Sequence, residues 1–260
     1  MRRVLTLSYY NDPNFGDRLG YHLVNSIVPP DCLVVHASVK PWTVPDEPFD
    51  LLILGIGNSL NSATVRRDEL LALIDRVPRT VGIFGIQYAH HFGKVVPVER
   101  FQSLLDRLSF WFARSRRDLD RFGRGRTNAI HLGDWLVTMF PMTQWTDPGT
   151  LVIPPGIKRI DAPLDRAIQK IQRYRRVDSA RLHPLLCALT SAEAVAYHEQ
   201  REDPYQQVSG KFAAMLLDVF GRELPPDVFF DVDRDAVARY KTQVSANVQH
   251  LAETVRSLLI

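Results

Sequence analysis

The sequence predicts an α/β fold with a doubly wound parallel sheet, because short apolar runs alternate with helical patterns through its first half. Several runs are apolar on both faces, as buried parallel strands are, and they end in polar or glycine-bearing loops. The clearest is Asp50–Ser59, where Leu-Leu-Ile-Leu leads into Gly-Ile-Gly-Asn-Ser. The chain of 260 residues, 45% of them hydrophobic, is long enough for one large domain or two small ones.

The first half contains four strand–loop–helix units. We expect strands at Arg3–Tyr10, Cys32–His36, Asp50–Ser59, Thr80–Gln87 and Thr127–Asp134. We expect helices at Arg18–Ile27, Arg66–Arg76 and Phe101–Phe112. The order of strand, glycine loop and helix at the start is typical of a unit that binds phosphate groups, although the loop lacks the GxGxxG pattern of dinucleotide binding.

Turn residues and prolines between Pro141 and Pro155 indicate a domain boundary, which divides the chain into residues 1–145 and a smaller unit, 146–260. The smaller unit is again α/β. We expect an edge strand at Leu151–Pro154, helices at Pro163–Tyr174 and Val208–Phe220, strands at Glu193–His198 and Val228–Val232, and a closing helix at Asp235–Leu259.

Composition favours a cytoplasmic protein. No run approaches the roughly eighteen apolar residues of a membrane span, and the start of the chain reads as a strand rather than a signal peptide. Cys32 and Cys187 have no partner spacing, so we expect two buried free thiols.

The net charge of +3 conceals two basic stretches. They consist of Arg114, Arg116, Arg117, Arg121, Arg124 and Arg126, and of Arg159, Arg166, Lys170, Arg173, Arg175 and Arg176. Such stretches are typical of a solvated face, but they also suit phosphate groups, anionic lipid headgroups or nucleic acid. No nucleic-acid reader motif accompanies them, so we expect no nucleic-acid partner.

The most informative segment is Val177–Leu189, where a polar turn leads into an apolar helix. We expect Asp178 or Ser179 to cap this helix, which places Arg181 and His183 in its first turn, where free N–H groups favour an anion. A guanidinium and a titratable imidazole at such a place are typical of a group-transfer site. The alternative is a capped amphipathic helix whose two polar residues face water.

Six short motifs follow one another in order. They are Asn14-Phe-Gly16-Asp17, Gly55-Ile-Gly57-Asn58-Ser59, Arg114-Ser-Arg-Arg-Asp118, Gly133-Asp134, Ser179-Ala-Arg181-Leu-His183 and Lys211-Phe212. Together they resemble the polysaccharide pyruvyltransferase family, from about Val4 to about Ile260. The chain departs from the family pattern at Ser115, Asp118 and Trp135, and its second domain is reduced.

The resemblance implies an enzyme with two Rossmann-like domains facing a cleft, as in GT-B glycosyltransferases. It implies transfer of the enolpyruvyl group of phosphoenolpyruvate to sugar hydroxyls, commonly as a ketal, in surface-polysaccharide biosynthesis. The acceptor would be a sugar or a lipid-linked saccharide, in the cytoplasm or at the inner face of the membrane. No metal or other cofactor is expected.

The donor carries a phosphate and a carboxylate, so its site needs fork-shaped cations. We expect Arg114 and Arg181 to clamp these groups with help from Lys211, and His183 to transfer protons. Asp17 is either a base for the acceptor hydroxyl or simply the cap of the helix at Arg18. The motifs add Asn14, Gly16, Gly57, Asn58 and Asp134 to the expected substrate-binding residues.

Two other functions remain open: a GT-B-like glycosyltransferase that uses a nucleotide sugar, and a non-catalytic partner in polysaccharide assembly. Asp231-Val-Asp233-Arg-Asp235 resembles a metal-binding Asp-x-Asp, but its place before the last helix favours capping. His90-His91 is expected to be a pair of loop histidines rather than a metal site. Trp42, Trp111, Trp135 and Trp145 are either buried aromatics or platforms for a sugar ring.

Overall fold

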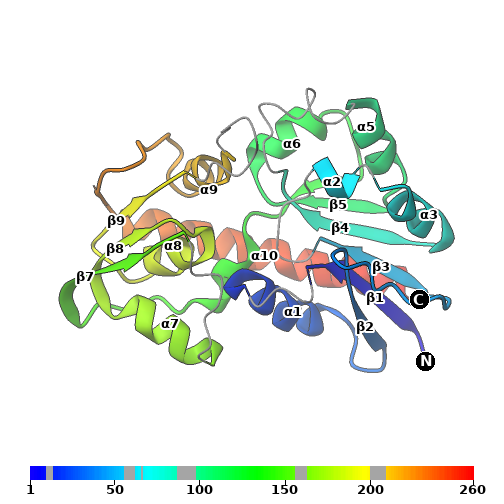
Figure 1. Cartoon of the computed structure of the whole chain (residues 1–260), viewed down its shortest axis with the longest axis horizontal. Coiled ribbons are helices and arrows are strands. Elements are labelled where there is room, and N and C mark those ends of the chain that lie inside the picture. The colour runs from blue at the N-terminus through cyan, green and yellow to red at the C-terminus, as the bar shows by residue number, and fades with distance from the viewer. Residues whose placement is uncertain (10–13, 56–61, 66, 87–97, 156–162, 200–208) are drawn as a thin grey trace.

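The computed structural model describes residues 1–9, 14–55, 62–65, 67–86, 98–155, 163–199 and 209–260. It contains a six-stranded parallel sheet and a smaller four-stranded mixed sheet, which form two α/β domains (Figure 1). The doubly wound fold predicted for the first half is therefore confirmed, and a second α/β unit follows it.

The larger sheet has the strand order β2-β1-β3-β4-β5-β6. Its strands are β1 (Arg3–Ser8), β2 (Leu33–Ser38), β3 (Leu51–Leu54), β4 (Thr80–Phe84), β5 (Phe110–Ala113) and β6 (Ala129–His131). The helices that follow are α1 (Phe15–Ile27), α2 (Ser62–Val65), α3 (Asp68–Arg76), α5 (Val98–Asp106), α6 (Arg116–Phe122) and the short 3₁₀ helix η2 (Trp135–Met139). Because all six strands are parallel, the loops after them emerge at one edge, where open α/β sheets bind ligands.

Both faces of this sheet are buried, which explains the continuous apolar runs of the sequence. Successive side chains of a strand point to opposite faces. Leu51 and Ile53 belong to the core shared with α1, whereas Leu52 and Leu54 belong to the core beneath α3 and α5. The core on the α1 side continues into the second domain, so the two domains are packed together rather than joined by a loose linker.

The smaller sheet has the order β10-β9-β8-β7. Its strands are β7 (Asp147–Ile153), β8 (Tyr174–Ser179), β9 (Ala194–Tyr197) and β10 (Phe230–Asp231), and its helices are α7 (Leu164–Gln172), α8 (Leu182–Leu189) and α9 (Lys211–Phe220). β10 runs antiparallel to β9, which makes the sheet mixed, and β7 lies at the edge as predicted.

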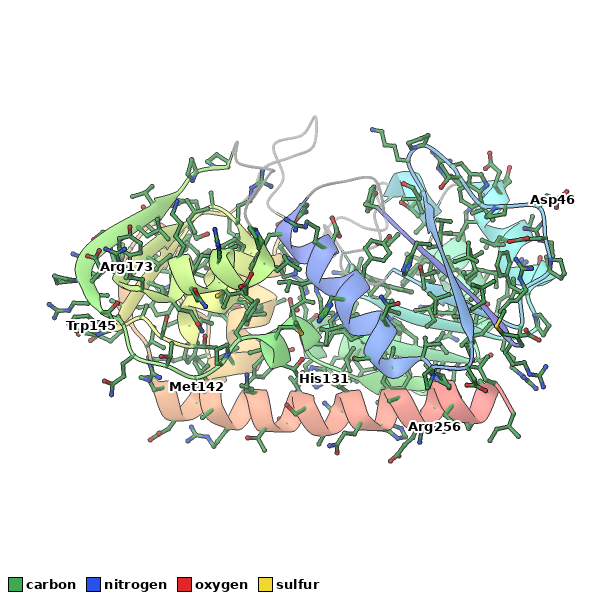
Figure 2. All side chains as sticks on the ribbon, turned by 90° about the horizontal axis from the view of Figure 1, so that it is seen from below. Asp46, His131, Met142, Trp145, Arg173 and Arg256 are labelled. Atoms are coloured by element: carbon green, nitrogen blue, oxygen red, sulfur yellow. The ribbon has the colours of Figure 1, made fainter. Side chains whose placement is uncertain are left out.

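The closing helix α10 (Arg234–Leu258) is 25 residues long and spans both domains. It begins beside the smaller sheet and contacts α9, η2 and α1 along its length. Figure 2 shows it along one side of the molecule, with His131 above its middle and Arg256 near its end. Asp233 caps it by accepting a hydrogen bond from the Ala236 N–H at 2.9 Å, which confirms capping for this aspartate.

The structure corrects the predicted helix at Phe101–Phe112. α5 ends at Asp106, and the run Phe110-Trp-Phe-Ala is the buried strand β5 between β4 and β6. Four consecutive apolar residues have no periodicity that separates helix from strand. Here the segment is a strand because it forms backbone hydrogen bonds with β4 and β6.

The structure also corrects the environment of one thiol. Cys187 is buried and free as predicted, and burial raises its pKa well above the ordinary value. Cys32 is free but only half-buried, because it precedes β2 at the edge of the sheet.

The two basic stretches differ in their surroundings. In the second, every described member is exposed, as expected of a solvated face; Arg159 lies outside the described residues. In the first, Arg114, Arg117 and Arg126 turn inward. Arg117, for example, donates hydrogen bonds to the carboxylate of Asp118 and to the carbonyl oxygen of Gly210, so a solvated face was the wrong prediction for half of this stretch. No described helix is long and apolar enough to cross a membrane.

Candidate functional site

Four segments that lie far apart in the sequence meet at the carboxyl edge of the larger sheet. α1 begins shortly after β1, Arg114 follows β5, and Asp134 follows β6. The fourth segment is the start of α8 in the second domain, which brings His183 against α1. Side chains from both domains therefore build one site.

His183 and Asp134 form the centre of this site. The imidazole Nε2 lies 3.5 Å from Asp134 Oδ2, and both side chains are almost fully buried, with 8% and 2% exposed. The separation is at the long limit for a hydrogen bond, and neither atom has a hydrogen-bond partner among the described residues. A buried carboxylate oxygen and a buried ring nitrogen without hydrogen-bond partners can both bind a water molecule or a hydroxyl group of a ligand. The burial of His183 also contradicts the alternative in which it faces water.

Arg114 adds a cation to the pair. Its Nε lies 3.9 Å from Asp134 Oδ2, and only 11% of its side chain is exposed. Gly85, which follows β4, makes room for it: a Cβ at Gly85 would lie 3.3 Å from Arg114 Nε. The arginine is thus held inside the site rather than extended into solvent.

The electrostatics keep Asp134 ionised. Burial alone would raise the pKa of this carboxyl group, but His183, Arg114 and the N–H of Leu136 outweigh burial and hold the pKa below its ordinary value. Asp134 also caps η2 by accepting from that N–H at 3.4 Å. The arrangement is a carboxylate close to an imidazole, with a guanidinium beside it, which suits proton transfer next to an anion.

Gly16 has a role that its place in a loop-like motif did not reveal. A Cβ built on Gly16 would lie only 1.8 Å from His183 Nδ1. The imidazole ring therefore lies directly on the backbone at the first turn of α1, and no residue with a side chain fits at this position without moving the ring.

The cap of α1 is Asn14, not Asp17. The Asn14 side chain accepts a hydrogen bond from the Gly16 N–H at 3.0 Å, so the alternative of Asp17 as the cap is wrong. Asp17 instead lies in the first turn, 2% exposed, where the N-terminal end of the helix dipole favours a carboxylate. Asp17 directly follows Gly16, against which the His183 ring is packed, so Asp17 remains a candidate residue of the site.

Arg181 occupies a different place from the one predicted. α8 begins at Leu182 with Arg181 as its cap residue, and neither Asp178 nor Ser179 caps the helix. The Ser179 hydroxyl instead bonds the backbone of Arg181, accepting from its N–H at 3.1 Å and donating to its carbonyl oxygen at 2.8 Å. Because the Ser179 hydroxyl makes these two hydrogen bonds within the turn, it does not cap the helix. The Arg181 guanidinium donates to the carbonyl oxygen of Pro155, which follows β7 (Asp147–Ile153).

Lys211 is the first residue of α9, as expected from its place in the sequence. Its charge acts on the carboxyl group of Glu199 and lowers the pKa of that group. Burial raises the pKa of Glu199, against hydrogen bonds from the backbone of Ala213 and Gly210 and the charges of Lys211 and Arg117. Gly57 and Asn58 lie outside the described residues.

The tryptophans and the possible metal ligands are the remaining candidates. Trp111 and Trp135 are buried and thus unavailable as sugar platforms, whereas Trp42 and Trp145 are half-buried beneath arginine side chains. Among the residues that the structure describes, no group of three His, Cys, Asp or Glu side chains is arranged to hold a metal ion. His90 and His91 are not among the residues described.

The sequence did not indicate that Asp134 pairs with His183, nor that Tyr240 of α10 reaches the same loop. The Tyr240 hydroxyl accepts a hydrogen bond from the Asp134 N–H at 2.6 Å. The only signal for Tyr240 was its place in the apolar pattern of the closing helix, which marks a core residue equally well.

Comparisons with known proteins add no family to this geometry. No model of a known protein family matches the chain, and a search of curated proteins found no match. The resemblance to the pyruvyltransferases therefore rests on the motifs, and the site must be interpreted from its own chemistry.

Proposed function

We propose that this protein is a pyruvyltransferase that moves the enolpyruvyl group of phosphoenolpyruvate onto sugar hydroxyls, in the manner of the polysaccharide pyruvyltransferases. The observation that carries the proposal is the buried His183–Asp134 pair with Arg114 beside it. It combines a proton-transfer group with a fork-shaped cation, which are the two groups that this donor requires.

The reaction assigns a role to each group. The enol carbon C3 of the donor gains a proton while an acceptor hydroxyl adds to C2 and loses its own proton. The C2–O bond to phosphate then breaks, and a second hydroxyl of the sugar adds to C2, gives its proton to the departing phosphate and closes the ketal. His183 would move the proton at C3, with Asp134 holding the imidazole in one orientation, and Asp17 would accept the proton of the acceptor hydroxyl.

The donor anions would lie between Arg114 and the start of α8. The free N–H groups of a helix N-terminus favour a phosphate or carboxylate, and Arg114 supplies a guanidinium beside them. Arg181 would join them by exchanging the carbonyl oxygen of Pro155 for an oxygen of the donor. In this proposal the two α/β domains correspond to the two facing domains of a GT-B-like enzyme.

Thermal unfolding with phosphoenolpyruvate, beside nucleoside diphosphates and nucleotide sugars, tests the donor. A ligand at one hundred times its Kd stabilises the folded state by about 2.7 kcal/mol. For a chain of this size that corresponds to a rise in Tm of roughly 5–10 °C. Arg114→Ala and Arg181→Ala should each reduce the rise, whereas Arg121→Ala, an exposed arginine of the same basic stretch as Arg114, should keep it.

The same experiment separates the other functions. Stabilisation by a nucleotide but not by phosphoenolpyruvate would select the glycosyltransferase. No response to any of these ligands would favour the non-catalytic partner. A positive response would justify a search for acceptors, with release of inorganic phosphate as the readout.

We also propose that the second basic stretch holds the enzyme at an anionic membrane when the acceptor is lipid-linked. Its described members are exposed, although Arg173 and Arg175 have carboxylate partners in Asp147 and Glu193. Flotation with phosphatidylserine vesicles should show binding at low salt that is lost at high salt. Binding that is absent at low salt would contradict a membrane role.

A further inference from the structure

One face of the closing helix α10 contacts the loop that carries Asp134. Tyr240, Val244 and Asn247 are spaced four and three residues apart, which puts them on the same side of the helix. The Asn247 amide donates a hydrogen bond to the carbonyl oxygen of Leu132 at 3.1 Å, and the Tyr240 hydroxyl accepts from the N–H of Asp134 at 2.6 Å. Three consecutive residues of the loop are thus placed by a helix that begins in the other domain.

Between these two hydrogen bonds, Gly133 is packed directly on the helix. Its φ of +82° is in the left-handed region, which favours glycine. A Cβ here would also lie 2.6 Å from Val244 Cγ2 and 3.1 Å from Tyr240 Oη. The loop backbone is therefore in close contact with α10 at this point, and only glycine fits there.

The Tyr240 hydroxyl is a neutral and rigid anchor. The residue is 5% exposed, and burial together with the nearby carboxylates of Asp218 and Asp134 raises the pKa of the phenol well above its ordinary value. The hydroxyl therefore stays protonated at neutral pH while its oxygen accepts the backbone N–H. Removing that oxygen would leave the Asp134 N–H buried without its acceptor, an unfavourable state that a shift of the loop can relieve.

We propose that Tyr240 is a positioning residue of the site: by holding the backbone of Asp134, it keeps the Asp134 carboxylate directed at His183. The inference rests on the proposed function only in its catalytic consequence, because the positioning of the pair is a property of the protein without substrate. Groups that orient a catalytic imidazole need their own fixed support, and a loose second layer weakens the pair even when both members are present.

The test compares Tyr240→Phe with Asp134→Asn in the full chain. Long-range ¹H–¹⁵N spectra at neutral pH report the tautomer and hydrogen bonding of each imidazole, and His183→Asn identifies the His183 signals by their loss. Asp134→Asn should displace these signals, because the carboxylate orients the ring. Tyr240→Phe should displace them in the same direction.

Tyr197→Phe is the matched control. The Tyr197 hydroxyl donates to the carbonyl oxygen of Leu224 at 2.7 Å, so this variant also loses one tyrosine–backbone hydrogen bond. Tyr197 is not part of the site, so the His183 signals of the Tyr197→Phe variant should coincide with those of the unmodified protein. If pyruvyl transfer is established, Tyr240→Phe should lower kcat by roughly tenfold to a hundredfold and leave the KM for phosphoenolpyruvate nearly unchanged.

The proposal would be overturned if the His183 signals of Tyr240→Phe coincide with those of the unmodified protein. It would also be overturned if Asp134→Asn leaves the His183 signals unchanged. Should Tyr240→Phe not fold, Asn247→Ala decides in the same way, because Asn247 is only half-buried and its loss removes the hydrogen bond to the neighbouring Leu132. Displaced signals in a protein that ignores phosphoenolpyruvate would support the positioning role and contradict the pyruvyltransferase, so the two failures are distinguishable.

Discussion

Replacing Gly16 by alanine should damage the site while improving the helix that carries it. Alanine is favoured over glycine inside a helix by about 1 kcal/mol, and no positive φ opposes it at this position. The new methyl group, however, would lie 1.8 Å from His183 Nδ1, 2.3 Å from Cε1 and 2.8 Å from Cγ. Ordinary van der Waals contact begins at 3.4 Å, so the ring has to retreat by about 1.6 Å.

The size of the effect follows from these two opposing contributions. Inserting a methyl group into a packed interior costs about 1–3 kcal/mol, and the helix recovers up to about 1 kcal/mol of it. We therefore expect a net loss of up to about 2 kcal/mol, or a fall in Tm of up to roughly 8 °C. A displacement of more than 1 Å at a catalytic group lowers turnover by about a hundredfold, so activity should fall far more than stability.

A double-mutant cycle with His183→Ala isolates the contact. Without the imidazole the added methyl group has no ring to displace, and Gly16→Ala should then raise Tm by the gain in helix propensity. The change in sign between the two backgrounds, measured by scanning calorimetry, is the specific prediction. Equal destabilisation in both backgrounds would show that the cost lies in α1 itself, and the geometric reasoning would be wrong.

Three further predictions concern other parts of the structure. If the protein transfers pyruvyl groups as proposed, His183→Ala should lower that activity by roughly 10²–10⁴-fold in a steady-state assay without unfolding the chain, and full activity would remove the imidazole from the mechanism. His198 has its two ring nitrogens 2.6 Å from Asp227 Oδ1 and Asp178 Oδ1, and the hydrogen bond to Asp227 is the main reason why its pKa is raised above 6.5. The resulting stabilisation is complete below pH 6.5 and is lost as pH rises through the raised pKa. The Tm advantage over His198→Gln should therefore shrink as pH is raised above 6.5, and a constant difference would contradict the protonated clamp. Lys241→Met removes an ammonium that donates to three carbonyl oxygens around the end of η2 and should lower stability by about 1–3 kcal/mol in chemical denaturation, whereas an unchanged midpoint would show that these carbonyls find water.

Much of the fold was predictable because parallel strands and amphipathic helices leave local patterns. Leu51–Leu54 is apolar on both faces, and α7 and α10 have clear polar and apolar sides, so the sequence indicated each of them. The predicted helix at Phe101–Phe112 includes Phe110, Trp111 and Phe112, which are the first three residues of β5. The true state of this segment depends on hydrogen bonds to β4 and β6, which are formed by residues elsewhere in the chain.

The candidate site was predictable in its location but not in its contacts. Polar and glycine residues after parallel strands must gather at one edge of the sheet, and this places Gly16, Arg114 and Asp134 in one region. The pairing of His183 with Asp134 joins two domains, and no local spacing encodes it. Gly16 illustrates the same limit: its motif indicates a turn, whereas the space it leaves is filled by an imidazole from 167 positions further along the chain.

The origin of the pair in two domains has a consequence for catalysis. Leu132 and Trp135 flank Asp134 in the sequence, and Leu182 and Leu185 flank His183. All four belong to one continuous core, so the domains cannot separate widely without exposing apolar surface. The gap of 3.5 Å between Nε2 and Oδ2 needs to close only to about 2.8 Å to become a charge-assisted hydrogen bond. Hydrogen bonds of catalytic groups are often long before substrate binds and shorten in the complex. We therefore expect donor binding to tighten the pair by a small adjustment within the packed interface, and a crystal structure with phosphoenolpyruvate that leaves the separation at 3.5 Å would contradict this expectation.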